Sequence, residues 1–368
     1  MRMRIDRYWK QTAAGLLTAM ILMLTGGVPE SFAMPRSQPF TAQENTLFSP
    51  DKIIISEEQK SSQAAEGTTA DVSAAQSGAE LAAFGAVSTP VIDSSSMFGS
   101  GRLTMLANHA TEAQQLSVII ETGEGGLIVV DGGWTTSADY LLDQIKQKGG
   151  HVQAWLLTHP DSDHVGALAD ILYKHSGEIT IDGVYYSFAP DSWYEEKDPE
   201  VAKMLAYLKG ALGLLPPEKL HGDIVSGQVI NAGPARIQVL NQAYQCSSDF
   251  VNNSSVAYMV SLNGTNTVFL GDLARAGGEK LMTEHDLSAL KCDIVQLAHH
   301  GQNGVDYEVY KALRPRVALW PTPQWLWDNN NGGGAGSGPW LTQQTKNWMV
   351  RLGVKSNFCI KDGDQVIE

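Results

Sequence analysis

Four potential metal ligands lie within six consecutive residues of this chain. The segment that starts at position 159 reads His-Pro-Asp-Ser-Asp-His, which brings His159, Asp161, Asp163 and His164 into one short stretch. Carboxylates packed this closely repel one another, and a divalent cation removes that repulsion. A polar turn or a helix cap at Asp161 or Asp163 would explain one residue of the set but not all four. The segment therefore predicts a metal site.

The same kinds of side chain follow two other predicted strands, each beside a glycine that lets the loop turn tightly. The strand over residues 267–270 leads to Asp272, and the strand over residues 293–298 leads to His299 and His300. Each motif alone is weak evidence, because Gly-Asp turns and paired histidines are common in loops. Together with the first cluster they complete a set of imidazole and carboxylate ligands for two metal ions.

Beyond residue 100 the sequence alternates between short apolar runs, typical of strands, and amphipathic stretches, typical of helices. Strands are predicted over residues 116–121, 127–130, 154–158, 179–184, 237–240, 256–262, 267–270, 293–298 and 317–320. Helices are predicted over residues 137–148, 166–175, 199–212, 279–285, 307–313 and 341–352. Glu-Gly-Gly at 124–126 is typical of a hairpin turn. Because strands and helices mix after an initial hairpin, the pattern favours an α/β sandwich over a barrel of alternating units.

The chain is acidic, because 26 Lys and Arg against 40 Asp and Glu give a formal net charge of −14. This charge disfavours non-specific nucleic-acid binding, which relies on clustered Lys and Arg. It does not exclude a nuclease, since a bound metal can supply positive charge locally. The hydrophobic content of 43% excludes wholesale disorder. Three cysteines, Cys246, Cys292 and Cys359, are too few for a zinc ribbon, and one bridge plus a free thiol stays open.

Residues 1–33 have the layout of a secretory signal peptide. Basic residues up to Lys10 precede an apolar run over 13–24, and Ser31-Phe32-Ala33 offers small residues for cleavage. The apolar run is shorter than the ~20 residues that a membrane span needs. We therefore expect cleavage after Ala33 rather than a retained anchor, and a location outside the cell or in the cell envelope.

Residues 34–96 are rich in Ser, Ala, Gln, Thr and Glu and lack apolar periodicity. Such a segment cannot bury enough apolar surface to offset its ordering entropy, which is typical of a flexible low-complexity spacer. The folded domain is therefore expected over residues 97–368, and no membrane span is predicted after the signal. Its oligomeric state is not indicated by the sequence.

The order of these motifs resembles the metallo-β-lactamase superfamily. A strand leads into His-x-Asp-x-Asp-His and a helix, Phe-Leu-Gly-Asp follows, and His-His-Gly comes last. The match is closest to the branch that includes the hydrolase domain of ComEC-type DNA-uptake proteins, and Leu-Ile-Val-Val-Asp-Gly-Gly at 127–133 is similar to the superfamily's second strand. The resemblance covers about residues 100–368 and implies the superfamily's αββα sandwich.

The resemblance also implies a six-residue ligand set, namely His159, Asp161, Asp163, His164, Asp272 and His300. The first two would hold one ion and the next two the other, with Asp272 bridging. Asp163 would also orient the nucleophile, and His299 would donate a proton to the leaving group, although His299 and His300 could exchange roles. The expected cofactor is zinc, as one ion or two, with manganese as an alternative.

This chain departs from the common superfamily pattern at two points. The superfamily usually has a histidine where Asp161 stands and another in the segment before the Gly-Asp strand. Here that segment carries Asn252, Asn253 and Ser255, which are expected to contact substrate or to support the ligands. One metal position is therefore poorer in imidazole, and a single tightly held ion stays open. The membrane channel that defines ComEC is absent from this chain, so DNA uptake is not inferred.

Four tryptophans flank a glycine-rich stretch at residues 329–338. They are Trp320, Trp325, Trp327 and Trp340. Two interpretations stay open for them, because they could line a substrate cleft or pack beneath a long loop.

The superfamily hosts many hydrolytic reactions, so the resemblance implies a hydrolase without fixing its substrate. We favour a secreted hydrolase of phosphoesters, with phosphodiesters preferred, that uses a metal-bound hydroxide at a dinuclear His/Asp site. Cell-wall phosphorylcholine esterases share the scaffold, so the expected substrate is a small molecule or a cell-envelope polymer. The alternative is a hydrolase of amide, lactone or thioester bonds. An exported binding protein without turnover would predict eroded ligands, yet this set is nearly complete.

We predict that the mature protein begins near Met34. The expected result follows from the small residues at the end of the apolar run, and N-terminal sequencing of secreted material checks it. A sequence that starts at Met1 would contradict the signal-peptide prediction.

Overall fold

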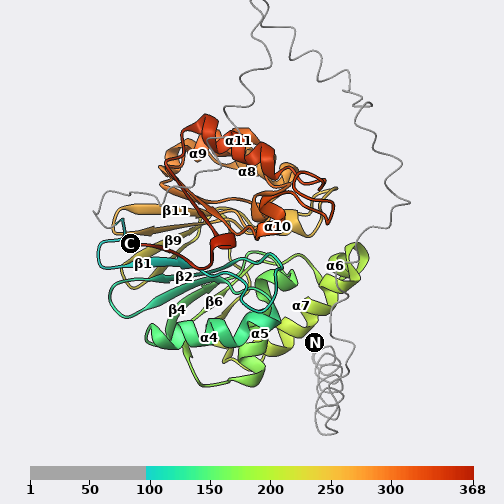
Figure 1. Ribbon diagram of the computed structural model, residues 1–368. Coiled ribbons are helices and arrows are strands. Elements are labelled where there is room, and N and C mark those ends of the chain that lie inside the picture. Colours follow the sequence, from blue (N-terminus) through green and yellow to red (C-terminus); the bar gives the residue numbers. More distant parts are fainter. Residues whose placement is uncertain (1–96) are drawn as a thin grey trace, which may run out of the picture. The chain divides into compact units, whose positions relative to one another are not determined.

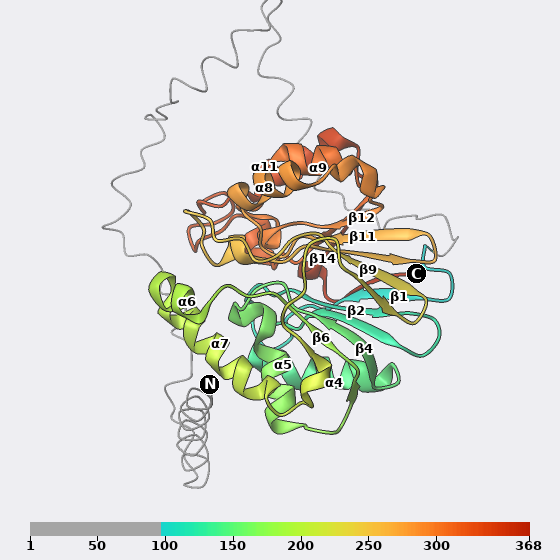
Figure 2. The ribbon, with the colours of Figure 1, turned by 180° about the vertical axis from the view of Figure 1, so that it is seen from behind.

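Two β-sheets pack face to face, and helices cover both outer faces (Figures 1 and 2). This computed structural model describes residues 97–368. The signal peptide predicted at 1–33 and the spacer predicted at 34–96 lie outside the described residues. Within the described range, the αββα sandwich predicted from the sequence is confirmed.

The first sheet combines strands from the beginning and the very end of the domain. Its strands are β1 (Arg102–Met105), β2 (Ser117–Glu121), β3 (Leu127–Asp131), β4 (His151–Leu156), β5 (Thr180–Ile181), β6 (Val184–Tyr185), β7 (Leu220–His221) and β15 (Gln365–Ile367). They lie in the order β15-β1-β2-β3-β4-β6-β7, with β5 also paired to β4. The strand β15 pairs antiparallel with β1, so the last strand of the chain forms the edge of this sheet.

The second sheet is made of strands from the C-terminal half. They are β8 (Val229–Ala232), β9 (Ala235–Val239), β10 (Tyr258–Leu262), β11 (Thr265–Phe269), β12 (Ile294–Gln296), β13 (Val317–Trp320) and β14 (Ser356–Cys359). Their spatial order is β14-β13-β12-β11-β10-β9-β8, so that neighbours in sequence are neighbours in the sheet. Pairing is antiparallel from β8 to β11 and parallel from β11 to β14.

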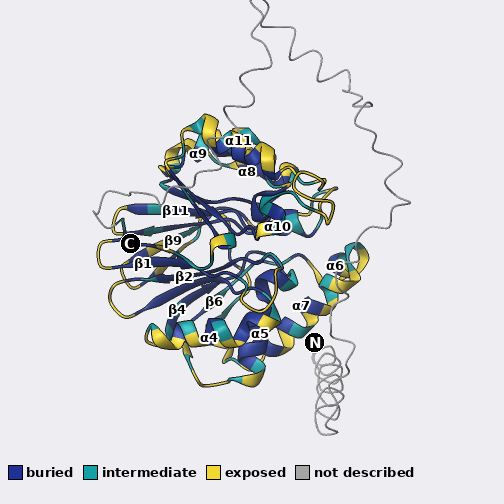
Figure 3. Cartoon of the chain, viewed as in Figure 1, coloured by how far each residue is buried: buried dark blue, intermediate teal, exposed yellow. Residues whose placement is uncertain are grey.

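The helices divide between the two outer faces. Those of the first half are α4 (Ala138–Gln147), α5 (Ser162–Lys174), α6 (Asp191–Lys197) and α7 (Pro199–Leu212). Those of the second half are α8 (Arg275–Glu284), α9 (Tyr307–Leu313), α10 (Gln324–Trp327) and α11 (Thr342–Leu352). Short 3-10 helices lie at Thr135–Ser137, Pro217–Lys219, Asn252–Ser254, Leu287–Leu290, His299–Gly301 and Ile360–Asp362. In Figure 3 the helices expose only their outward sides, whereas the sheets are largely buried.

Continuous apolar strands follow from this layering, because a central strand is buried on both faces. In β3, Ile128 and Val130 point into the core between the sheets, and Leu127 and Val129 point toward the helices. In β10, Tyr258 and Val260 line the same inter-sheet core. Because side chains alternate along a strand, one strand contributes to the core between the sheets and to the core between sheet and helices.

Parallel pairing brings the chemically interesting strand ends to one edge. The strand β3 runs parallel to β4, and β11 runs parallel to β12, so in each pair the carboxyl ends lie side by side. The two sheets are joined at this edge by the backbone N–H of Val256, which donates to the Thr158 carbonyl at 2.8 Å. The Tyr258 hydroxyl donates to the Leu157 carbonyl at 2.7 Å. Loops from both sheets therefore meet at one place.

Most predicted elements are present, and the differences have simple causes. The predicted hairpin at 124–126 joins β2 and β3, with Glu121 opposite Leu127. The strand predicted over 179–184 is split into β5 and β6, which pair with successive parts of β4. The sequence did not indicate β1, β7, β8, β14 and β15, which are two to four residues long and too short to show a period.

Two other questions from the sequence have direct answers. All three cysteines are free in the structure, so no disulfide forms among them. Within residues 97–368, none of the helices has both the length and the apolar character that crossing a membrane requires.

We predict that Gly166→Ala destabilises the fold. A Cβ atom at Gly166 in α5 would lie 2.6 Å from the backbone N of Thr135 and 3.0 Å from the carbonyl carbon of Trp134, and backbone cannot yield cheaply. Overpacking of this kind costs about 1–3 kcal/mol. Thermal melting of both proteins checks the loss of stability.

Gly210→Ala in α7 is the matched control. There a Cβ would meet chiefly the hydroxyl of Tyr173, the movable end of a flexible side chain, and alanine favours helix by about 1 kcal/mol. The control should melt at or above the wild-type temperature. Equal melting temperatures for the two variants would contradict the packing argument.

Candidate metal centre

The segment that follows β4 turns at once into the first turn of α5. His159 lies in the loop and is fully buried, whereas Asp163 and His164 belong to the helix itself. The helix begins at Ser162, four residues before the start that the sequence predicts at residue 166. Asp161 occupies the N-cap position, yet its side chain makes no capping hydrogen bond. The carboxylate of Asp161 is therefore available for another partner.

Asp272 and His300 approach the same point from the second sheet. Asp272 follows β11 and is 3% exposed, and His300 follows β12 and is 1% exposed. His300 Nε2 lies 3.2 Å from Asp272 Oδ2 and 3.2 Å from Asp163 Oδ2. His164 Nε2 lies 3.3 Å from Asp272 Oδ1. The structure thus brings together ligand-type residues predicted from three separate strand ends.

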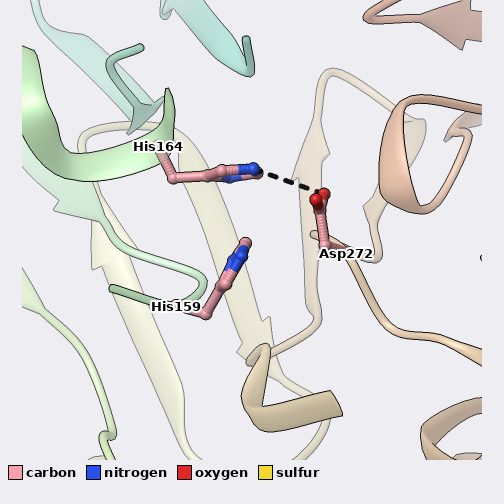
Figure 4. A group of neighbouring side chains, drawn as sticks. All are labelled: His159, His164 and Asp272. Atoms are coloured by element: carbon pink, nitrogen blue, oxygen red, sulfur yellow. Dashed lines mark ion pairs between the residues drawn. The ribbon is translucent and has the colours of Figure 1, made fainter. Parts of the chain in front are cut away.

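The imidazole nitrogens that face this centre lack hydrogen bonds. The Nε2 atoms of His159, His164 and His300 are buried without a hydrogen-bond partner, as are Asp161 Oδ1 and Asp272 Oδ1. Figure 4 shows the rings of His159 and His164 turned toward the Asp272 carboxylate. Buried polar atoms normally have partners, and a divalent cation would supply one to all of them. These residues therefore fit a metal.

Two overlapping groups have metal-binding geometry. In one, His159, His164 and Asp272 offer ligand atoms that all lie within 4.8 Å of one another. In the other, Asp163, His164 and His300 do the same. Asp161 belongs to neither group, but its Oδ2 lies 3.3 Å from His159 Nε2 and its side chain is 24% exposed. The ligand atoms near His300 are therefore the more deeply enclosed.

Histidines and carboxylates at the centre hold each other in their charged forms. Burial would lower the pKa of His164, but Asp272 and Asp131 outweigh it and raise that pKa well above the usual value. Burial would likewise lower the pKa of His300, which the Asp272 and Asp163 carboxylates raise to about 9. Burial raises the pKa of Asp272, yet His300 and His164 hold it well below its usual range. A cation would replace the protons on these rings.

A carboxylate that we did not assign from the sequence orients His164. Asp131, at the end of β3, is fully buried, and its Oδ2 lies 2.7 Å from His164 Nδ1. The same carboxylate accepts hydrogen bonds from the backbone N–H and the hydroxyl of Thr158, at 2.8 and 2.7 Å. An Nδ1–H that points at Asp131 leaves Nε2 facing the centre. The signal was the Asp-Gly-Gly that ends the strand at 127–133.

The segment that carries Asn252, Asn253 and Ser255 supports the ligand loops. Asn253 is buried, and its Oδ1 accepts hydrogen bonds from the backbone N–H groups of Ala274 (3.0 Å) and Gly277 (2.8 Å) at the start of α8. Ser255 is also buried, and its Oγ accepts from the Asp272 backbone N–H at 2.9 Å. Two of these three residues therefore hold backbone in place, and Asn252 is only partly buried.

The two adjacent histidines sit on strained backbone. His299 and His300 have φ values of 50° and 54°, and Gly301 follows at 75°. Non-glycine residues seldom adopt this left-handed region, and such strain clusters at functional sites. His300 Nδ1 lies 3.1 Å from the Pro321 carbonyl, so its Nε2 is the nitrogen that faces Asp272. The Nδ1 of His299 is buried without a partner, and burial, assisted by the charge of His300, lowers the pKa of His299.

The tryptophans divide between the two open interpretations. Trp320 is fully buried and packs edge-on against Trp327, with ring centroids 5.1 Å apart. Trp325 and Trp340 pair at 4.9 Å and are both partly exposed. The first pair is core packing beneath the loop, whereas the second pair has the exposure that a contact with a substrate would need.

The sandwich and the converging His/Asp ligands define a metallo-β-lactamase-type protein with a site for divalent metal. Residues 110–228 match the sequence profile described as the metallo-beta-lactamase superfamily. This match confirms the resemblance to that superfamily that the motifs predicted. The superfamily's fold implies divalent metal binding, and the groups around His164 provide for it.

Sequence similarity connects the chain to one curated protein. It is 26% identical over 216 residues to ComE operon protein 3 of Bacillus subtilis (strain 168), across 56% of this chain and 25% of that protein. The chain therefore spans about a quarter of the length of this relative. The similarity confirms the resemblance to the ComEC-type branch.

Solved structures align with the chain at low sequence identity and with TM-scores below 0.5. The metallo-beta-lactamase fold protein YhfI from Bacillus subtilis aligns with a TM-score of 0.45 and 12% identity, over 73% of this chain and 99% of that one. CmlA, a diiron beta-hydroxylase from Streptomyces venezuelae, aligns with a TM-score of 0.46 and 12% identity, over 73% of this chain and 54% of that one.

We predict that Asp131→Asn weakens metal binding about 10- to 100-fold, the usual effect of losing a partner that orients a ligand. The new amide N–H₂ would favour the His164 tautomer with a bare Nδ1 and a protonated Nε2, which cannot bind a metal. Competition with a chromophoric chelator measures the affinity.

Asp364→Asn is the control, because Asp364 also accepts three hydrogen bonds, from Ala107 N, His109 and the Tyr140 hydroxyl, but belongs to neither ligand group. It should bind metal as the wild type does. Equal losses in the two variants would show that the effect is not specific to His164.

Proposed function

We propose that the protein is an exported metal-dependent hydrolase of phosphoesters, with phosphodiesters preferred. The observation that carries the proposal is the convergence on Asp272 of three buried imidazole Nε2 atoms that make no hydrogen bond. A divalent cation would give these nitrogens a partner, and the set is more complete than a binding protein without turnover requires. Export rests on the N-terminal sequence pattern alone.

A divalent cation held by these side chains would lower the pKa of a bound water and stabilise the negative charge on the oxygens of the attacked phosphoryl group. The residues that would hold the more enclosed ion are Asp163, His164, His300 and Asp272. His159 and Asp161, with Asp272 shared, would hold a second. Asp163 has one oxygen near His300 and is 7% exposed, so its carboxylate can accept a hydrogen bond from the attacking water and orient it.

His299 is our candidate for proton transfer to the leaving oxygen. Its side chain is partly buried beside His300, and its Nδ1 atom is buried without a hydrogen-bond partner. Because burial lowers its pKa, the ring is neutral over more of the neutral pH range than an exposed histidine. A neutral imidazole can donate an N–H hydrogen bond to a leaving oxygen. Donation of a full proton needs the protonated ring, and the fraction of protonated ring falls as the pH rises.

Zinc is the metal that we expect in the isolated protein. Imidazole ligands suit zinc, and zinc stands above manganese in the general affinity order. The metal position that Asp161 serves has one imidazole, from His159, and two carboxylates, from Asp161 and Asp272. The side chain of Asp161 is partly exposed. We therefore propose that this second position is weaker and accepts manganese. Metal analysis after gentle purification, followed by removal and readdition of each ion, tests both statements.

The substrate class is tested by comparing activity on bis(p-nitrophenyl) phosphate with activity on nitrocefin and on a lactone. Metal-loaded protein should cleave the phosphodiester and lose that activity when the metal is removed. Activity on the acyl substrates alone would replace the phosphoesterase with the amide, lactone or thioester alternative. A metal content below about 0.2 per chain would favour the binding protein, because an intact ligand set should retain its ion.

We predict that Asp163→Ala and His164→Ala each lower turnover of the phosphodiester by more than about 100-fold, because each removes a ligand on which the activated water depends. Circular dichroism should show that both variants remain folded. His221→Ala is the control, since His221 stacks on Tyr185 with centroids 4.4 Å apart and belongs to neither ligand group. A His221 variant as inactive as the Asp163 variant would refute the assignment.

A cell-envelope polymer or a small phosphoester is the substrate that the proposed location favours. The net charge of −14 disfavours long nucleic acids. A comparison of the hydrolysis of teichoic-acid-type polymers with that of single-stranded DNA would separate an envelope-polymer substrate from a nucleic-acid substrate. We expect the polymer to be cleaved faster.

A further inference from the structure

A buried amide lies between the loops that carry Asp272 and His300. Gln296, the last residue of β12, is 0% exposed. Its Oε1 accepts a hydrogen bond from the backbone N–H of Leu270 at 2.8 Å. Its Nε2 donates to the carbonyls of Gly271 at 3.0 Å and Leu297 at 2.7 Å. One side chain therefore holds the backbone of both strands just before their ligands.

This amide replaces sheet hydrogen bonds that the two strands no longer make. The parallel register of β11 and β12 pairs Thr267 with Ile294 and Val268 with Val295, and it ends there. Leu270 and Gly271 lie beyond the ladder, but both residues are still buried. Buried peptide groups need partners, and Gln296 provides them.

The Gly271 carbonyl is the point at which the two ligand loops meet. It accepts one hydrogen bond from Gln296 Nε2 and a second, at 3.1 Å, from the backbone N–H of His299. Gly271 has a φ of 55°, and a Cβ there would lie 2.8 Å from Thr158 Cβ, so this peptide has little room to move. Any shift of the Gly271 carbonyl would therefore displace both Asp272 and the strained pair of histidines.

We propose that Gln296 is a positioning residue of the metal centre. Its amide sets the placement of the Asp272 carboxylate relative to the His300 ring. The Oδ2 atom of Asp272 and the Nε2 atom of His300 lie 3.2 Å apart. Gln296 belongs to neither ligand group and acts through the Gly271 carbonyl. The inference rests on the metal centre of the proposed function, but it is independent of the substrate class.

A purely structural role is the competing explanation, and the same strand offers a control for it. At the opposite end of β11, the Nδ2 of Asn266 donates to the carbonyls of Leu290 at 3.1 Å and Lys291 at 3.2 Å. Asn266 thus also joins β11 to the chain that leads into β12, but at the end remote from Asp272. Removing either amide should cost stability, whereas only Gln296 should affect the metal.

The test compares Gln296→Met, which keeps the length of the side chain without its hydrogen bonds, with Asn266→Ala. For each we would measure Zn²⁺ affinity by chelator competition, the visible absorption spectrum of the Co²⁺-loaded protein, and the melting temperature without metal. Gln296→Met should weaken Zn²⁺ binding at least about 10-fold, the lower end of losses seen for supporting residues, and alter the Co²⁺ spectrum. Asn266→Ala should change only the melting temperature.

Gln296→Met that folds, binds Zn²⁺ like the wild type and shows an unchanged Co²⁺ spectrum would overturn the inference. Should this variant fail to fold, Gln296→Glu carries the same test, because it keeps the acceptor for Leu270 and loses the donor to Gly271. An altered Co²⁺ spectrum with weaker Zn²⁺ binding supports the inference, and wild-type values overturn it. A wild-type protein that binds Zn²⁺ but cleaves no phosphoester would contradict the proposed function. The conclusion that Gln296 positions the metal centre would be unaffected.

Discussion

Buried negative charge is the constraint on which the centre of this molecule depends. Asp131, Asp163 and Asp272 are all nearly inaccessible at one end of the sandwich, and like charges so close are unfavourable without compensation. In the described part of the chain, the ion-pair partners of these three carboxylates are histidines. Histidine is suited to this task, because it can be positive without a cation and can offer a lone pair when a cation is present. The same contacts can thus serve both states.

The scaffold stabilises this arrangement by fixing the backbone that carries each ligand. Parallel strands deliver Asp131 and His159 from one sheet and Asp272 and His300 from the other. Buried side chains then hold the loops, as Ser255 does for the Asp272 backbone. The ligands are therefore placed by hydrogen-bonded strands and by single buried polar groups rather than by flexible loops, which favours a preorganised centre.

The sequence was most informative where chemistry and pattern coincide. Closely spaced carboxylates and histidines, each after an apolar run, indicated the centre because few other arrangements tolerate them. The sandwich followed from mixed strands and helices and from family resemblance. Short strands such as β1 and β15 were not predictable, because three or four residues show no period and their pairing is decided by distant contacts.

Supporting residues were harder to predict for a different reason. Asp131 stood at a recognisable strand end, but its partner His164 is distant in sequence, and only folding brings them together. Asn253 was expected to contact substrate or to support the ligands, and the sequence could not show that its side-chain oxygen accepts hydrogen bonds from the backbone at the start of α8. Gln296 carried no sequence signal, since a single glutamine in an apolar strand has many explanations. Polar residues whose partner is backbone leave no pattern to find.

The pairing of β15 with β1 bears on how the protein is made. Leu103 lies opposite Ile367, so the edge of the first sheet is completed by residues that leave the ribosome long after the rest of that sheet. Until then, β1 presents unpaired peptide groups along an apolar strand, the kind of edge that other chains can join. Pairing over such a separation in sequence is also slow to form. Until its C-terminal residues are available, a nascent chain of this design therefore carries an edge at β1 where wrong pairing can begin.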